Sequence, residues 1–179
     1  MKGKYKGATH QNLVKNGNFA DGTTGWTGVF SVLDGRANFL ATGQWQIVKQ
    51  VIKTVVGHKY YFSADLVADA GVYYGNLGAG VTVTHPVNGK VFTIITAFSD
   101  SVSIGIGDSR TSGFTNTYFD NVMVIDLTAE GLTDLTEDQL NQKFSHYIDG
   151  MQSVQPQEIK SVGKNLFDIN KPELLIMSF

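Results

Sequence analysis

Short runs of β-branched and aromatic residues, separated by turn signals, fill the first 127 residues of this chain. In the clearest run, 59–68, the even positions are apolar and the odd positions are mostly polar. This two-residue period predicts strands with one face in the core and one face in water. No helical pattern separates the runs, so an antiparallel sandwich is favoured over a parallel βαβ fold. The expected strands are 37–41, 44–55, 59–68, 80–84, 90–97, 101–106 and 116–125.

Turn-forming residues supply the breaks between these strands. Asn88-Gly89 is the strongest hairpin signal, because a type I′ turn needs a positive φ at both central positions. We therefore predict a tight hairpin there, between strands 80–84 and 90–97. Flanking glycines indicate a loop over 71–80, which carries two adjacent tyrosines.

The composition changes near residue 127, because all four glutamates lie beyond residue 129. Glutamate favours helices and is depleted in strands, so we place a boundary there. The predicted organisation is an N-terminal lead, a β-sandwich, a helical connector, and a linker or the start of a following segment. These parts span 1–11, 12–127, 128–150 and 151–179.

The connector carries the signals of one short helix. Thr136 is placed to begin it, and Gln139 to complete a capping box. The apolar stripe of this helix consists of Leu140, Phe144, Tyr147 and Ile148. Gly150 should end the helix at about residue 149. The extended tail behind it closes on an apolar run, 174–177, that has no continuation, so we expect the chain to be a fragment of a longer protein.

Composition excludes several classes of partner and site. The formal net charge is −2, so no basic field would attract a phosphate backbone, and no nucleic-acid partner is expected. The absence of cysteine excludes disulfides and thiolate metal sites. No apolar run follows the basic start at 1–6, and none elsewhere is long enough to span a bilayer. Neither a signal peptide nor membrane insertion is therefore expected.

The β-rich part offers little acid–base chemistry. Glycosidases generally use a pair of carboxylates, often including a glutamate, and this part has no glutamate. Asp65, Asp69 and Asp108 are more simply surface residues of strands and loops. The four histidines have neither metal-ligand nor triad spacing. We therefore expect no enzymatic activity.

Two motifs bracket the β-rich part. Residues 12–19 read NLVKNGNF and are followed by Gly25-Trp26, and residues 118–124 read YFDNVMV. The first is expected to form an opening strand and turn, the second a closing strand. As a pair they resemble the jelly-roll carbohydrate-binding modules, whose chains open with N-L-x-x-N-G-x-F and close with F/I-D-x-V. The continuation, LTEDQL at 135–140 and GKNLF at 163–167, resembles modules of tail and baseplate proteins from phages that infect Gram-positive bacteria.

This resemblance implies a jelly roll that binds host cell-wall polysaccharide during adsorption and catalyses no reaction. It also implies a protein of the phage tail in the virion, made in the host cytoplasm without a signal peptide, with other tail or baseplate proteins as partners. Two alternatives stay open: a purely structural tail domain that mediates protein packing, and an accessory module of a bacterial glycosidase. In the family, the Gly-Trp after the first motif closes one end of the sandwich, which assigns Trp26 to the core.

More aromatic side chains are present than a core of Val, Ile, Leu and Phe requires, which points to a saccharide-binding surface. Aromatic rings offer a large contact area at little entropic cost. We expect this surface on an exposed sheet face or its rim. The residues assigned to it are Trp45, Tyr73 and Tyr74, with Arg110, Gln46 and Asp108 as polar partners for sugar hydroxyls. Adjacent tyrosines of a strand point to opposite faces, so one of the pair can belong to the core.

A structural calcium near the first and last strands is the one cofactor that the resemblance implies. Asp120 matches an aspartate that the family uses as a ligand. The position of the family's glutamate ligand is Ala20, which cannot ligate. Calcium takes six to eight oxygen ligands, so the loss of one carboxylate weakens such a site. We therefore expect at most a weakened calcium site at Asp120.

Overall fold

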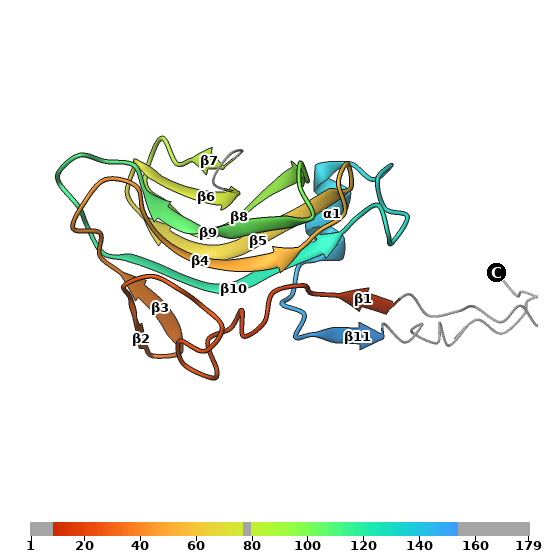
Figure 1. Ribbon diagram of the computed structural model, residues 1–179, viewed down its shortest axis with the longest axis horizontal. Coiled ribbons are helices and arrows are strands. Elements are labelled where there is room, and N and C mark those ends of the chain that lie inside the picture. Colours follow the sequence, from red (N-terminus) through yellow and green to blue (C-terminus); the bar gives the residue numbers. More distant parts are fainter. Residues whose placement is uncertain (1–8, 77–79, 154–179) are drawn as a thin grey trace, which may run out of the picture.

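Two antiparallel sheets packed face to face form the body of the molecule, in a computed structural model that describes residues 9–76 and 80–153 (Figure 1). The five-stranded sheet contains, in order, β2 (Ser31–Leu33), β3 (Arg36–Phe39), β10 (Thr117–Asp126), β5 (Lys59–Ala68) and β8 (Val87–Thr96). The four-stranded sheet contains β4 (Gln46–Lys53), β9 (Ser101–Asp108), β6 (Val72–Asn76) and β7 (Val81–Thr82). Apart from the added edge strand β2, this is the two-sheet arrangement of a jelly roll. The predicted antiparallel sandwich is thus confirmed.

The inward-facing residues of the two sheets form the main core. Phe62 and Leu66 of β5 and Phe119 of β10 face the four-stranded sheet and are almost fully buried. Ile104 and Ile106 of β9 face them from the other side. The two-residue period therefore predicted the inner face of both sheets correctly.

The two sequence motifs meet at one end of this core. The ring centroids of Phe19 and Trp26 lie 5.2 Å apart, and those of Phe19 and Phe119 lie 5.3 Å apart. Trp26 is buried, as the resemblance implied. A glycine is required beside it, because a Cβ on Gly17 would lie 2.2 Å from the carbonyl oxygen of Val122 in β10.

The opening motif does not form a strand, contrary to the prediction. Residues 12–19 turn around the buried side chain of Asn12, which replaces the hydrogen bonds of a strand ladder. Its partners are the backbone groups of Val14, Val122, Val124 and Ile148. Asn16 and Phe19 have φ angles of 51° and 52°, which a regular strand does not allow.

The closing motif contains a β-bulge in β10. Asp120 pairs with Asp65 of β5, whereas Met123 pairs with Ser63, so two residues of β10 oppose one of β5. Asn121 has a φ of 52° there, a conformation that asparagine tolerates better than most residues. Asp120 and Asp65 therefore face each other on the outer side of the five-stranded sheet.

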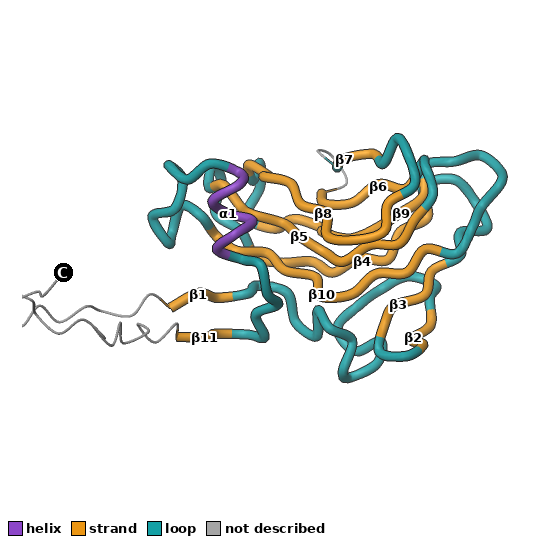
Figure 2. The backbone as a smooth tube through the Cα atoms, turned by 180° about the vertical axis from the view of Figure 1, so that it is seen from behind, coloured by secondary structure: helices purple, strands orange, loops and turns teal. Residues whose placement is uncertain are grey.

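Helix α1 (Glu137–Lys143) and the residues after it cover part of that outer side, at one end of the sandwich (Figures 1 and 2). Thr136 caps the helix, and Gln139 completes the predicted capping box. A second apolar cluster joins this segment to the sheet, with buried members Tyr61, Met123, Ile125, Leu127, Leu140, Phe144 and Ile148. The predicted wet face of β5 is wrong at this end, because the cluster buries Tyr61 and Ser63.

The helix is also shorter than predicted. It ends at Lys143, and Phe144 is its C-cap. The carbonyl oxygen of Phe144 accepts a hydrogen bond from Lys90 Nζ of β8 instead of continuing the helical ladder. Ile148 reaches the apolar cluster from beyond the helix.

Two predictions about the connections between strands are wrong, a hairpin and a loop. Asn88-Gly89 lies inside β8, opposite Val67 and Leu66, and makes no hairpin. The preceding strand, β7, belongs to the other sheet, so the chain crosses between sheets over 83–86 instead of folding back. The predicted loop at 71–80 contains β6, which pairs with β9.

A two-stranded ribbon projects from the same end of the sandwich as α1 (Figures 1 and 2). It consists of β1 (Thr9–Gln11) and β11 (Met151–Ser153), which place Thr9 opposite Ser153. The predictions for the 174–177 run and the GKNLF motif lie outside the described residues, and the domain division at 127 stays a prediction. None of the helices in the described ranges is long and apolar enough to cross a membrane.

Candidate functional site

Trp45 is the most exposed of the aromatic residues assigned to the site, with 62% of its surface accessible. It stands directly before β4, where β4, β9 and β6 come together at one rim of the four-stranded sheet. Asp108 at the end of β9 pairs with Gln46 on one side and with Val72 on the other. The backbone N–H of Trp45 donates to the carbonyl oxygen of Asp108 at 2.7 Å, which fixes the residue to this rim.

The backbone of Trp45 is held in the left-handed region, with a φ of 64°. This conformation is unfavourable for a bulky residue and persists only where the surroundings impose it. An exposed tryptophan in a strained conformation has no evident role in the core. Strain of this kind is often found at functional sites, which makes Trp45 the first candidate for a binding surface.

Tyr73 supports Trp45 from beneath and is itself only 5% exposed. The two ring centroids lie 5.8 Å apart, with the rings tilted by 51°. Tyr73 pairs with Gly107 of β9, and its ring occupies the space that a side chain there would need, because a Cβ on Gly107 would lie 2.5 Å from Tyr73 Cζ. Burial, and secondarily the charge of Asp108, raises the pKa of the Tyr73 hydroxyl. Tyr73 therefore supports Trp45 and presents no free face, so the prediction of a sugar contact is wrong for Tyr73.

Tyr74 was assigned to the site, and this prediction is wrong. The residue points to the opposite side of β6 and belongs to the main core. Its ring is stacked on Phe62 at 5.9 Å, and its hydroxyl donates to the carbonyl oxygen of Phe92 at 3.1 Å. The alternation of a strand separates the two tyrosines, as expected for adjacent residues.

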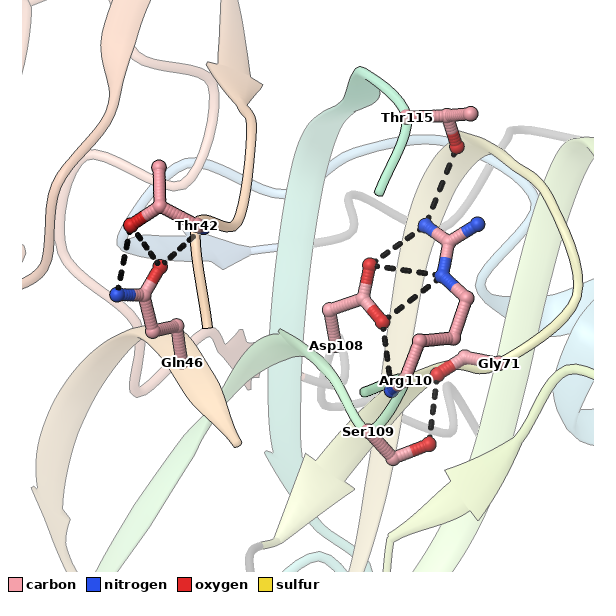
Figure 3. A network of polar contacts seen from close by, with 7 residues as sticks. All are labelled: Thr42, Gln46, Gly71, Asp108, Ser109, Arg110 and Thr115. Carbon is pink, nitrogen blue, oxygen red and sulfur yellow. Dashed lines mark hydrogen bonds and ion pairs between the residues drawn. The ribbon is translucent and has the colours of Figure 1, made fainter. Parts of the chain in front are cut away.

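Asp108 and Arg110 form a clamp beneath the rim (Figure 3). The Asp108 side chain is 1% exposed and accepts hydrogen bonds from the backbone N–H, Nε and Nη2 of Arg110 at 2.9, 3.0 and 2.5 Å. Arg110 Nη2 also donates to Thr115 Oγ1 at 3.1 Å, which ties down the loop after β9. The prediction of a sugar contact is therefore wrong for the Asp108 carboxylate, which is enclosed. Arg110 keeps 18% of its side chain accessible at the rim.

Gln46 is partly exposed and is oriented by Thr42 (Figure 3). Its Oε1 accepts from the Thr42 backbone N–H at 2.7 Å, and its Nε2 donates to Thr42 Oγ1 at 3.2 Å. Nearby, Gln44 Nε2 donates to the carbonyl oxygen of Ser109 at 3.0 Å. Both amide groups are thus fixed at this rim, and Gln46 shares the side of β4 that carries Val48, opposite the side of Ile47 and Lys49.

The outer side of β4 carries residues that the sequence reasoning missed. Val48, Gln50 and Ile52 face inward and are buried, so Ile47, Lys49, Val51 and Lys53 face outward in line with Trp45. Counting in twos from Trp45 along the predicted strand would have identified this row.

Asp120 is the calcium ligand that the resemblance implied, and it lies far from this rim. It lines a hollow on the outer side of the five-stranded sheet, together with Asp65. Burial and the charge of Asp65 raise the pKa of Asp120, although the Asn121 backbone N–H donates to it at 2.7 Å. Asn121 Nδ2 also donates to Asp65, at 2.7 Å. Among the described residues no group of three or more His, Asp or Glu side chains is placed to hold a metal ion. Two carboxylates already bonded to Asn121 fall short of an ordinary calcium site.

Comparison with known proteins gives only distant structural similarities. The sequence matches no family model, and no curated protein matches it. Among solved structures, a family 4 carbohydrate-binding module is 18% identical and has a TM-score of 0.46, over 63% of this chain and 98% of that chain. A family 61 module in complex with β-1,4-galactotriose is 13% identical, with a TM-score of 0.42 over 64% and 97% of the two chains. A family 16 module is 18% identical, with a TM-score of 0.43 over 63% and 99%. Similarity of this degree assigns no ligand and no residue role to this chain.

Proposed function

We propose that this protein is a non-catalytic carbohydrate-binding module, which binds a polysaccharide at the rim formed by β4, β9 and β6. The observation that carries the proposal is Trp45, exposed and strained on a rigid support. Its indole face can pack against the C–H face of a sugar ring. Gln44, Gln46 and the accessible part of Arg110 then serve the hydroxyl groups.

The finer proposal is that the polysaccharide belongs to the cell wall of a Gram-positive host, and that the module acts in a phage tail or baseplate during adsorption. The opening and closing motifs and the LTEDQL continuation support it, through their resemblance to such modules. One rim of this size should bind weakly, with a Kd in the micromolar to millimolar range, or roughly −4 to −8 kcal/mol. Several copies on one tail would raise the overall affinity through effective concentration.

A structural role in protein packing is the second candidate, and an exposed apolar patch favours it. Val55, Val56 and Phe98 are 52%, 63% and 66% exposed. They lie on two neighbouring loops, which are joined by a hydrogen bond from Gly57 N to the carbonyl oxygen of Ala97 at 2.8 Å. Such a patch suits a contact with another tail protein.

To locate wall binding, one exposed aromatic residue is replaced at the rim and one in the apolar patch. We expect Trp45→Ala to abolish or strongly weaken binding to purified host cell walls in a pull-down. Phe98→Ala, which removes an equally exposed ring outside the rim, should bind as the wild type does. Unchanged binding by folded Trp45→Ala would refute this site, and loss of binding by Phe98→Ala alone would place wall binding at the apolar patch instead.

A further inference from the structure

The outer row of β4 continues the candidate site away from Trp45 with positive charge. Lys49 and Lys53 stand on the same face of the strand as Trp45, with the exposed Val51 between them. At about 3.3 Å per residue, the row from Trp45 to Lys53 extends roughly 26 Å. It is therefore long enough to contact several units of a polymer.

A third lysine is held along the edge of β4, next to the end of this row, by the chain before the sandwich. The side chain of Gln50 accepts from the Lys15 backbone N–H and donates to the Lys15 carbonyl oxygen, both at 2.9 Å. Lys15, Val51 and Lys53 line a common hollow with a volume of about 510 Å³. The cations thus come from two segments that are fixed to each other.

None of the three lysines is neutralised within the described part of the chain. The ion pairs there join His10 to Glu130, His58 to Asp126 and Arg110 to Asp108. Asp108 is also the only carboxylate in the strands of the four-stranded sheet, and it is enclosed by Arg110. Asp65 and Asp120 lie on the outer side of the other sheet. That face also carries Arg36, which lines the same hollow, and Lys90, the strand partner of Asp65, so its charges are mixed. The strands of the four-stranded sheet instead present lysines without an accessible carboxylate.

The neighbouring strand leaves this row uncovered. The outward positions of β9 opposite Lys49, Val51 and Lys53 are Gly105, Ser103 and Ser101, which have little or no side chain. Gly105 admits no larger residue, because a Cβ there would lie 2.1 Å from the carbonyl oxygen of Val48. Because these residues of β9 are small, they leave the neighbouring lysine side chains accessible to a ligand that lies along β4.

We propose that the ligand of this face is an anionic polysaccharide, which packs a sugar on Trp45 and places phosphodiester or carboxylate groups on Lys49, Lys53 and Lys15. This inference rests on the proposed function and names its substrate class. Charge complementarity commits the face to a polyanion, since lysines without carboxylate partners attract anionic groups within a Debye length of about 8–10 Å.

The test uses walls of a Gram-positive host as the probe and compares variants at low and high salt. The double variant Lys49→Gln/Lys53→Gln should bind about thirtyfold more weakly at low salt, on the order of 1 kcal/mol for each lysine near an anionic surface. Its binding should also depend less on salt than that of the wild type. The matched control, Lys59→Gln/Lys143→Gln, removes two exposed lysines elsewhere and should bind as the wild type does.

Chemical treatment of the walls identifies the anionic group. Loss of wild-type binding after hydrofluoric acid removes phosphodiester-linked polymers assigns the phosphate, and loss only after the carboxyl groups are reduced assigns the carboxylate. Wild-type binding that survives both treatments would overturn the inference. So would a Lys49→Gln/Lys53→Gln variant that binds like the wild type while Trp45→Ala does not, a result that leaves the proposed function standing. Wild-type binding that Trp45→Ala leaves intact would remove the proposed site itself.

Discussion

Asn12 shows how much one polar side chain can contribute inside this fold. It donates through Nδ2 to two carbonyl oxygens, Val122 at 3.2 Å and Ile148 at 2.9 Å. Its Oδ1 accepts from the N–H groups of Val14 at 3.0 Å and Val124 at 2.9 Å. One residue of the opening motif thus joins β10 to the segment that follows α1.

We expect Asn12→Ala to lower the free energy of unfolding by about 3 kcal/mol, because it leaves buried backbone groups without partners. Urea denaturation followed by circular dichroism measures the change. Asn116→Ala, at an exposed asparagine, should change the free energy by less than about 0.5 kcal/mol. Equal effects of the two substitutions would contradict the role assigned to Asn12.

Asp120 is a carboxylate that the fold accommodates at a cost in stability. Its raised pKa means that the folded state binds this proton more tightly than the unfolded state does. The corresponding stability is present at low pH and is lost as the pH rises through the pKa of the folded state. We therefore expect Asp120→Asn to raise the melting temperature at pH 7 and to change it little at pH 3. The control is Asp34→Asn, at an exposed turn. A lower melting temperature for Asp120→Asn at pH 7 would show that its charge stabilises the fold.

Calcium addition tests the same residue in another way. Since Ala20 stands at the expected ligand position and only two carboxylates share the hollow, millimolar calcium should raise the melting temperature by no more than a degree or two. Magnesium at the same concentration is the control for ionic strength. A large rise that disappears in Asp120→Ala would mean that backbone oxygens complete a calcium site here.

Among the elements, α1 and the residues after it act as a cover for one half of a sheet. Phe144 is 1% exposed, and its ring centroid lies 5.3 Å from both Tyr61 and His10. We expect Phe144→Ala to cost about 3–5 kcal/mol, the usual range for a buried phenylalanine. Thermal unfolding measures the loss, with Phe98→Ala at an exposed phenylalanine as the control. A small effect of Phe144→Ala would show that the cover is not part of the cooperative unit.

The same elements show which features the sequence predicts. The strand 59–68 and the helix start at Thr136 depend on local chemistry, alternation and a capping box, and both are found where predicted. The wet face of β5 was wrong because its cover comes from a segment about 80 residues later, which no local pattern reports. Asn88-Gly89 was wrong because the path between sheets overrode the turn propensity.

The candidate site was predictable only as a set of residue types. Alternation implied that Tyr73 and Tyr74 face opposite ways, but not which one faces inward. The exposure of Trp45 and the enclosure of Asp108 by Arg110 depend on how three strand ends meet. The structure exposes Trp45, whereas the side chains of Tyr73, Tyr74 and Asp108 are buried, and saccharide binding at this rim stays a prediction.

For the molecule as a whole, we expect no release of reducing sugar from cell walls. Asp108, the carboxylate in the strands at the rim, is enclosed, whereas glycoside hydrolysis generally uses two carboxyl groups on either side of the scissile bond. A reducing-end assay on purified walls measures this, with a wall hydrolase as the positive control. Release of sugar that Asp65→Asn or Asp108→Asn abolishes would overturn the expectation.

The ribbon of β1 and β11 makes the segment 9–153 suitable for insertion into another protein. Because residues 9 and 153 are Cα partners, the two ends of the segment 9–153 lie side by side at one place on the surface. The segment 9–153 can therefore be spliced as a cassette into a surface loop of an unrelated carrier, whose own ends need not move apart. The end of the sandwich where β4 begins would then point away from the carrier (Figure 1).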